Sequence, residues 1–174
     1  AIGGPITIGG PVTTGIFQAA TTQDFTSAAI TASTIQIIAG LGITTGALTG
    51  GDLIDLTAGA SLLFGDITTS GGLFIDSGGS LTTGNVQARE IGFEAVQGVT
   101  TGTLNAMSDI FVTAGSAIQT GAISSTMGLV EFEAGGALTS GAITAGQSVS
   151  LKSGGTLTVG NVTAGDEQDG AFSI

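Results

Sequence analysis

Pairs of apolar residues separated by one position recur along the chain at a nearly constant interval. One pair is Leu73 and Ile75, and the next is Ile91 and Phe93. Apolar residues at i and i+2 share one face of a β-strand, whereas a helical face requires steps of three and four. These pairs therefore predict a series of short strands: Ile35/Ile37, Ile54/Leu56, Leu73/Ile75, Ile91/Phe93, Ile110/Val112, Val130/Phe132 and Val149/Leu151.

A small residue marks the same point in each repeat and serves as its anchor. Successive anchors are 19, 18, 19, 19, 18, 19, 20 and 19 residues apart. An apolar residue lies three positions before every anchor, and from the second anchor onwards another lies two positions after it. A fixed period over a whole chain is the signature of a repeat architecture. The anchors are Gly9, Ala28, Gly46, Gly65, Gly84, Gly102, Gly121, Gly141 and Gly160.

A glycine also lies six positions before most anchors. Glycine at this point allows either a turn with positive φ or a close approach of two backbones. Val96 is the exception, in an 18-residue unit, and there we expect Gly98 to form the turn. The glycines of this column are Gly40, Gly59, Gly78, Gly115, Gly135 and Gly154.

Short strands, glycine turns and a 19-residue period predict an all-β fold, a single-stranded parallel β-helix (β-solenoid) of about nine coils. Residues 1–174 form one repeat domain in this interpretation. Coils stack at about 4.8 Å, so eight steps make a rod of roughly 38 Å. A β-sandwich would not explain the fixed period. The inward columns should be nearly fully buried, with Ile75, Ile110, Val112, Ile123 and Leu138 as test positions.

Composition removes several classes of function. The 174 residues include no His and no Cys, which excludes the usual zinc, haem and iron–sulfur sites and the Ser-His-Asp and Cys-His catalytic groups. Arg89 and Lys152 are the basic residues against 13 acids, a net charge of −11. Such a chain cannot neutralise many phosphates, so neither nucleic acid nor an anionic membrane surface is an expected partner.

Residues 25–51 carry no charge but do not predict a membrane span. Thr, Ser and Gly interrupt the stretch, so that no block of 18 residues in it is continuously apolar. The stretch also follows the same repeat as the charged parts of the chain. We therefore expect no membrane insertion.

The repeat itself points to a known family. The unit V-x-L-x-x-G-G-x-L-T-x-G-x-[IV] is present at residues 149–162 and, with other apolar residues in its first positions, at 73–86. It resembles the roughly 19-residue repeats of filamentous haemagglutinin-like exoproteins, which Gram-negative bacteria secrete by the two-partner route. The resemblance covers nearly the whole chain. It implies a right-handed parallel β-helix, an extracellular or cell-surface location and an adhesin or fibre role, and it carries over no functional site.

Two acidic residues form the first candidate for chemistry. Asp76 and Glu94 lie eight positions before their anchors, so they should be neighbours about 5 Å apart on the outer surface. Such a pair could share a proton or a cation in a carbohydrate-active solenoid. It is also what a charged, soluble face would carry, and we favour that interpretation. Glu133 and Lys152 are adjacent in the same column and predict a surface ion pair.

No cofactor is expected. Asp52, Asp55 and Asp66 could hold a structural calcium ion, but their glycine context breaks the tandem nonapeptide rule of calcium-binding solenoids. The cluster Asp166, Glu167 and Asp169 is expected to be a solvated loop. A column of threonines two positions before the anchors could bind ice if it formed an unbroken flat face, but Leu63 and Gln119 interrupt it.

Two phenylalanines break the alternation of inward apolar and outward polar residues. Phe74 and Phe111 lie ten positions before their anchors, between inward neighbours, and should point outward. Gly92 holds the equivalent position between them. Exposed aromatic residues beside a glycine predict a lateral contact patch.

The expected function is that of a structural, non-enzymatic rod in a secreted or cell-surface fibre or adhesin. The alternative is a carbohydrate-active β-helix segment whose catalytic elements lie outside the chain. Ile6 begins directly in the apolar pattern, and Phe172 and Ile174 restart it. We therefore expect a continuation of the same solenoid or end-to-end self-association into a filament. A ligand on a host or neighbouring cell surface is a further expected partner.

Overall fold

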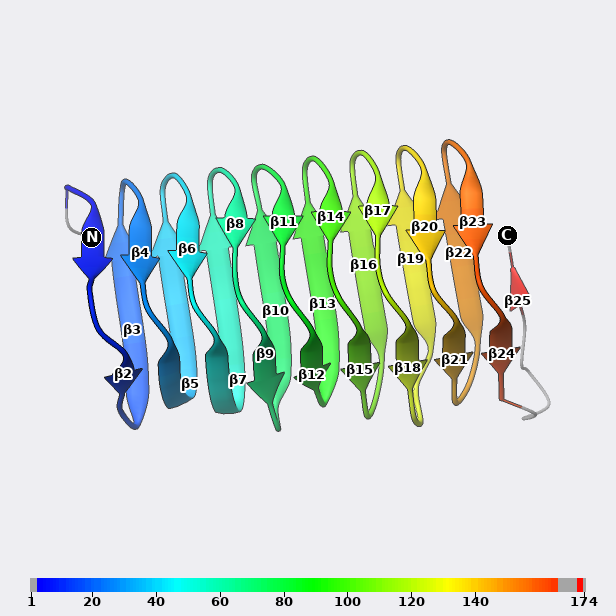
Figure 1. Ribbon diagram of the computed structural model, residues 1–174, viewed down its shortest axis with the longest axis horizontal. Coiled ribbons are helices and arrows are strands. Elements are labelled where there is room, and N and C mark those ends of the chain that lie inside the picture. Colours follow the sequence, from blue (N-terminus) through cyan, green and yellow to red (C-terminus); the bar gives the residue numbers. More distant parts are fainter. Residues whose placement is uncertain (1–2, 166–171, 174) are drawn as a thin grey trace.

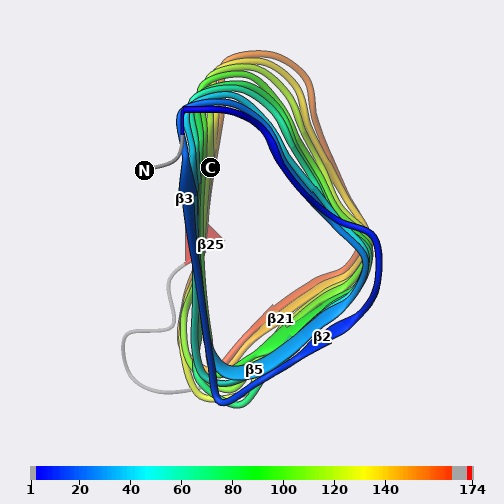
Figure 2. The ribbon, with the colours of Figure 1, turned by 90° about the vertical axis from the view of Figure 1, so that its left-hand side faces the viewer.

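The chain is an all-β parallel β-solenoid of about eight coils with a spacing of about 19 residues. The computed structural model describes residues 3–165 and the backbone of residues 172–173, and these contain no helix. The coils stack side by side along one axis (Figure 1) and superimpose into a three-sided outline (Figure 2). The predicted fold is confirmed. The nine anchors enclose eight intervals, which is why the coils number about eight and not nine.

One side of the solenoid is a sheet of nine parallel strands that precede the anchors. Each strand pairs only with its equivalents in the neighbouring coils. In order along the axis they are β1 (Ile6–Ile8), β4 (Phe25–Ser27), β6 (Ile43–Thr45), β8 (Leu62–Leu63), β11 (Leu81–Thr82), β14 (Val99–Thr100), β17 (Ile118–Gln119), β20 (Leu138–Ser140) and β23 (Leu157–Val159).

The other two sides belong to a second sheet of 16 strands, joined because β5 (Ile30–Ala39) and β7 (Leu48–Ala58) run through the corner between them. We call the side with the longer strands the long side, drawn at the left of Figure 2. Besides parts of β5 and β7 it contains β3 (Ile16–Thr21), β10 (Gly72–Ser77), β13 (Glu90–Ala95), β16 (Ile110–Ala114), β19 (Val130–Ala134), β22 (Val149–Ser153) and β25 (Phe172–Ser173). The third side contains β2 (Val12–Thr13), β9 (Ile67–Thr69), β12 (Val86–Ala88), β15 (Leu104–Ala106), β18 (Ile123–Ser125), β21 (Ile143–Ala145) and β24 (Val162–Ala164).

The register of pairing confirms that equivalent residues form columns. Leu73 pairs with Ile54 in the preceding coil and with Ile91 in the following one. The backbone of Phe172 pairs with that of Val149 and so continues the same register, and Ile174 lies outside the described residues. Each column therefore repeats along the axis at the distance between hydrogen-bonded strands.

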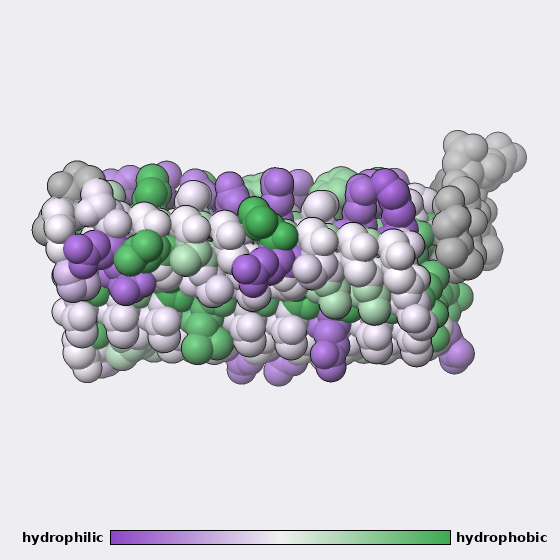
Figure 3. All heavy atoms as spheres, turned by 90° about the horizontal axis from the view of Figure 1, so that it is seen from above, coloured by the Kyte–Doolittle hydropathy of each residue, from purple (hydrophilic) through white to green (hydrophobic). Residues whose placement is uncertain are grey.

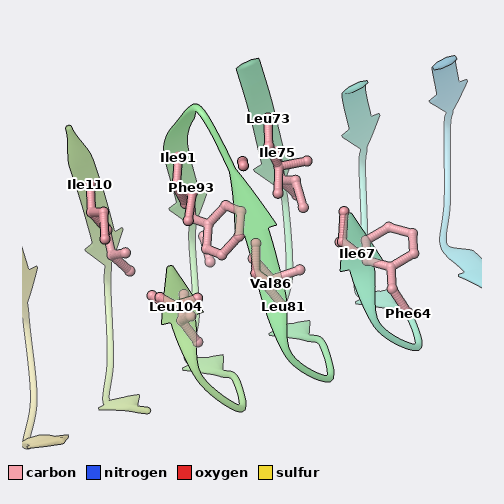
Figure 4. Packing of buried hydrophobic residues seen from close by; sticks show 14 of the residues in the cluster. Phe64, Ile67, Leu73, Ile75, Leu81, Val86, Ile91, Phe93, Leu104 and Ile110 are labelled. Carbon is pink, nitrogen blue, oxygen red and sulfur yellow. The ribbon is translucent and has the colours of Figure 1, made fainter. Parts of the chain in front are cut away.

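The inward columns make one continuous core. Ile75, Ile110, Val112, Ile123 and Leu138 are between 0% and 3% exposed, as predicted. Leu73, Ile91 and Phe93 point into the space between the sheets, together with residues of the opposite sides (Figure 4). Burial of Ile, Leu, Val and Phe at every coil supplies the main stabilisation of the fold.

The glycine column six positions before the anchors is a site of close backbone approach. A Cβ on Gly135 would lie 2.3 Å from the carbonyl oxygen of Gly115 in the preceding coil, and one on Gly78 would lie 2.3 Å from that of Gly59. No glycine of the described residues has a positive φ. Of the two alternatives, close packing is therefore the right one, and the expected turn at Gly98 is wrong, because in that unit the chain bends at Val96 and Gln97.

A buried column of hydroxyl groups lies one position before the anchors, and sequence analysis missed it. Thr83 donates to the carbonyl oxygen of Gly84 at 2.9 Å, and Thr45 donates to that of Gly46 at 2.9 Å. Phe64 replaces the hydroxyl in one coil and is also buried. The other members, Ser27, Thr101, Thr120 and Ser140, make the same bond to the next residue at 3.0–3.3 Å. Each inward polar group thus has a partner, as burial requires.

Truncation of Ile110 should destabilise the solenoid. Ile110→Ala removes a fully buried side chain and leaves a cavity in the stacked core, at an expected cost of about 2–5 kcal/mol. Urea unfolding followed by circular dichroism measures this change. Thr113→Ala on the exposed side of the same strand is the control and should change stability by less than about 0.5 kcal/mol. Equal effects of the two changes would contradict the described register.

A methyl group in the glycine column should also be costly. Gly135→Ala drives a Cβ against the Gly115 carbonyl, and such overpacking costs about 1–3 kcal/mol. Gly9→Ala is the matched control, because a Cβ there would meet no atom within 4 Å. Thermal unfolding of both variants should show a lowered midpoint for Gly135→Ala alone. An unchanged midpoint would show that the coils are not packed backbone to backbone.

Candidate functional site

Two outward columns run the whole length of the long side, and its inward positions are filled by core residues. The first column contains the predicted Phe74, Gly92 and Phe111, and the second contains Asp76 and Glu94. In full, the first is Gln18, Gln36, Asp55, Phe74, Gly92, Phe111, Glu131 and Ser150, and the second is Ala20, Ile38, Thr57, Asp76, Glu94, Thr113, Glu133 and Lys152.

Phe74 and Phe111 lie on the outer surface two coils apart, and Gly92 pairs with both. They are 42% and 38% exposed. A Cβ on Gly92 would lie 3.0 Å from Cδ1 of Phe74, and a Cβ on Gly72 would lie 2.7 Å from its Cε2. The Phe74 ring therefore lies down across two glycines instead of standing up from the sheet. We call Phe74, Gly92 and Phe111 the aromatic saddle.

The saddle is part of a shallow hollow of about 320 Å³ in the long side. Asp76 and Glu94, side by side on β10 and β13, lie on its rim with Asp55 and Thr113. The structure thus brings the predicted aromatic patch and the predicted acidic pair into one place, which sequence analysis treated as separate. The hollow is lined by Asp55, Phe74, Ile75, Asp76, Gly92, Phe93, Glu94, Phe111 and Thr113.

A ladder of amides leads towards the hollow from the N-terminal end. Gln18 Nε2 donates to Gln36 Oε1 at 3.2 Å, and Gln36 Nε2 donates to Asp55 Oδ2 at 3.3 Å. The Gln36 bond fixes one Asp55 oxygen on the side away from Phe74, because each step of the ladder runs along the axis. Asp55 therefore stands in an ordered position at the edge of the hollow.

The predicted ion pair is present further along the same side. Lys152 Nζ lies 2.5 Å from Glu133 Oε1, and both side chains are exposed. The hydrogen bond that Lys152 donates to Glu133, and then the negative charge of Glu133, raise the pKa of Lys152 above the ordinary value of 10.5. Solvent screens such a pair, so its contribution to stability is small.

The other acidic residues of sequence analysis do not converge. Asp66 Oδ1 accepts a hydrogen bond from the Asn85 N–H at 2.8 Å, and Asn85 Oδ1 accepts one from the Thr103 N–H at 3.0 Å, so these residues join successive corners. Across the described part of the chain, no group of three acidic residues lies close enough together to hold a metal ion. Asp52 lies at a corner, exposed. Asp166, Glu167 and Asp169 lie outside the described residues.

A second hollow, of about 570 Å³, lies at the corner between the third side and the long side. Met107 and Met127 are exposed there, with Arg89 and Asn105 beside them. Sequence analysis missed this hollow, because the positions five and six residues after the anchors hold no single residue type throughout and show no alternation. The only available signal was the presence of both methionines of the chain in equivalent parts of neighbouring units.

The threonine column lies on the outer surface of the nine-stranded sheet and is interrupted at Leu63 and Gln119, as the sequence predicts. Seen from above, the rod has a mostly pale surface with separate purple clusters and isolated green side chains (Figure 3). The described residues contain no helix of the length and apolarity needed to cross a membrane.

Comparisons with known proteins find no family model, no curated protein and no solved structure that matches this chain. The β-helix repeat architecture is shown by the structure alone. Membership of the filamentous haemagglutinin-like family stays a prediction from the repeat.

The raised pKa of Lys152 makes its ion pair sensitive to alkali. Because the folded state favours the charged ammonium, the stabilisation is complete below the unfolded pKa and is lost as pH rises through the higher folded pKa. Titration of the Lys152 amine by NMR should give a pKa above 10.5. Glu133→Gln removes the charged partner and should lower that pKa, whereas Glu131→Gln in the neighbouring column should leave it much closer to the native value.

Proposed function

We propose that this chain is a structural, non-enzymatic rod that forms part of a secreted or cell-surface fibre or adhesin. The observation that carries the proposal is the unbroken register of the coils. From Ile6 to Leu157, every strand of the nine-stranded sheet pairs with its sequence equivalent in the next coil. Such a solenoid is an extended stack of equivalent coils, and this shape suits a rod that spans a distance.

The continuous ladders suit a load-bearing element. Hydrogen bonds between coils run along the rod axis, for example from the Leu81 N–H to the Gly98 carbonyl at 2.9 Å. The same axis carries the stacked core of Ile, Leu, Val and Phe. A pull along the rod is therefore resisted by many hydrogen bonds in parallel on three sides of each coil.

The spacing of the anchors supports a structural role over a catalytic one. An enzyme needs walls that position a substrate and exclude water, and a solenoid builds such walls from insertions between strands. No interval between anchors exceeds 20 residues. A carbohydrate-active segment, the alternative from the sequence, would therefore need its catalytic elements from another part of a longer protein.

The two ends of the described rod support extension along the axis. Ile6, Ile8 and Val12 at one end, and Leu157 and Val159 at the other, are only partly buried, although their equivalents in the middle coils are nearly fully buried. A further coil, from the same chain or from a second copy, would cover these side chains and pair the edge strands β1 and β23. The extracellular location rests on the family resemblance.

Assembly of the purified chain tests the proposal. Electron microscopy and sedimentation over a range of concentrations should show rods of constant width whose length grows in steps of about 43 Å, because each copy adds nine strands to the nine-stranded sheet. The Ile6 N–H donates to the Asp24 carbonyl and the Ile8 carbonyl accepts from the Ala28 N–H, on either side of β4, so the Thr7 N–H points to the open edge. Thr7→Pro removes this donor and should block growth.

Thr7→Ala is the matched control, because it removes the same side chain but keeps the N–H, and it should assemble like the native chain. Assembly that is equally strong in Thr7→Pro, or that widens the rods instead of lengthening them, would contradict axial stacking. Cleavage of a polysaccharide by the chain alone would overturn the structural role itself.

A further inference from the structure

We propose that the aromatic saddle and the carboxylates around it bind arginine side chains of a basic polypeptide that lies along the rod. This interaction goes beyond the role as a rod and would hold whether or not the rods stack. It rests on the shape of the saddle, on the charge around it and on the distance between its two rings.

The saddle offers an aromatic face to solvent. Gly72 and Gly92 leave out the Cβ atoms that would clash with the Phe74 ring, so the ring lies across two strands and remains 42% exposed. Phe111 stands at the other end of the same hollow. A cation above such a ring is attracted by its quadrupole, and a flat guanidinium also stacks on it.

The charge around the saddle selects a cationic partner. Asp55, Asp76 and Glu94 lie on its rim, and Glu131 follows Phe111 in the same column. The one cation on the described long side is Lys152, which is bonded to Glu133. A second copy would bring two basic residues against 13 acids, so repulsion opposes contact between two long sides.

Arginine fits this arrangement better than lysine or a neutral sugar. The flat face of its guanidinium can stack on Phe74 while the N–H groups at the edge of the same plane donate to a carboxylate on the rim. The two interactions therefore do not compete. The rim offers mainly carboxylate oxygens, which accept hydrogen bonds, whereas a sugar hydroxyl is best held by donors and acceptors together.

The distance between the rings sets the spacing of the arginines. Phe74 and Phe111 are two coils apart, about 9.6 Å at the inter-strand distance. In a polyproline II segment, which has three residues per turn, side chains three apart point to the same side and are separated by roughly 9 Å. A polypeptide with arginines at i and i+3 would therefore place one guanidinium near each ring.

Binding of a synthetic peptide to the whole chain tests this inference. The probe is fluorescein-labelled, amidated Gly-Arg-Ala-Ala-Arg-Gly, and binding is followed by fluorescence anisotropy at low salt. Phe74→Leu keeps an apolar side chain but removes the ring, and it should weaken binding about tenfold. Asp76→Asn with Glu94→Gln should weaken it at least as much, and its thermal midpoint should not fall, since it relieves repulsion between two neighbouring carboxylates.

Two controls separate the saddle from the general charge of the rod. Asp24→Asn with Asp66→Asn, two residues that do not line the hollow, removes the same charge elsewhere and should change affinity less than twofold. The same peptide with citrulline for arginine should not bind. Equal binding of the citrulline peptide, or equal losses in both double variants, would overturn the inference. Binding of a neutral oligosaccharide that Phe74→Leu abolishes would assign the saddle to sugars and overturn it too.

Discussion

The distance of about 4.8 Å between paired strands is the constraint on which the whole structure depends. Every side chain on the rod has its own equivalent as a neighbour at this distance, above and below. Apolar residues in the inward columns satisfy the constraint easily, because Ile stacks well on Ile or Val. Outside, the same rule sets the polar pattern: Gln18 bonds to Gln36, Glu133 to Lys152, and Asp66 to the backbone of Asn85.

The constraint also explains where the surface departs from simple repetition. Gly92 separates Phe74 from Phe111 in their column, and because it has no Cβ the Phe74 ring has room to lie down and a hollow opens. Asp76 and Glu94 break the rule, since like charges face each other there without a cation on either side in the column. Like charges on neighbouring strands do not stabilise the fold. A role in binding would explain why this pair lies at the hollow.

Much of the architecture could be predicted because period-two alternation and a fixed interval are both visible in the letters. Ile110 and Val112 are assigned inward by their spacing alone. The buried hydroxyls could not be assigned, because Thr83 and Thr101 are polar and polar residues are usually exposed; only the path of the chain shows that they bond to a carbonyl one residue on. The corner hollow with Met107 and Met127 could not be predicted for a different reason: residues at the corners follow no alternation of inward and outward side chains. That Phe74, Asp76 and Glu94 share one hollow could not be predicted, because the hollow forms only where Gly92 leaves space between the two outward columns.

The equivalence of all coils has a consequence for how such a protein changes over generations. Thr82 pairs with Thr100, and Thr100 pairs with Gln119. Each coil therefore ends beside its own starting point, one inter-strand distance further along the axis. Loss or duplication of one complete unit would rejoin the strands in the same register and alter nothing but length. Gene rearrangements that add or remove complete units would therefore preserve the fold, whereas a one-residue shift of register within a strand would turn a core column towards the solvent. The length of this architecture can therefore change by whole coils, and surface features such as the saddle can be moved, doubled or deleted together with the coils that carry them.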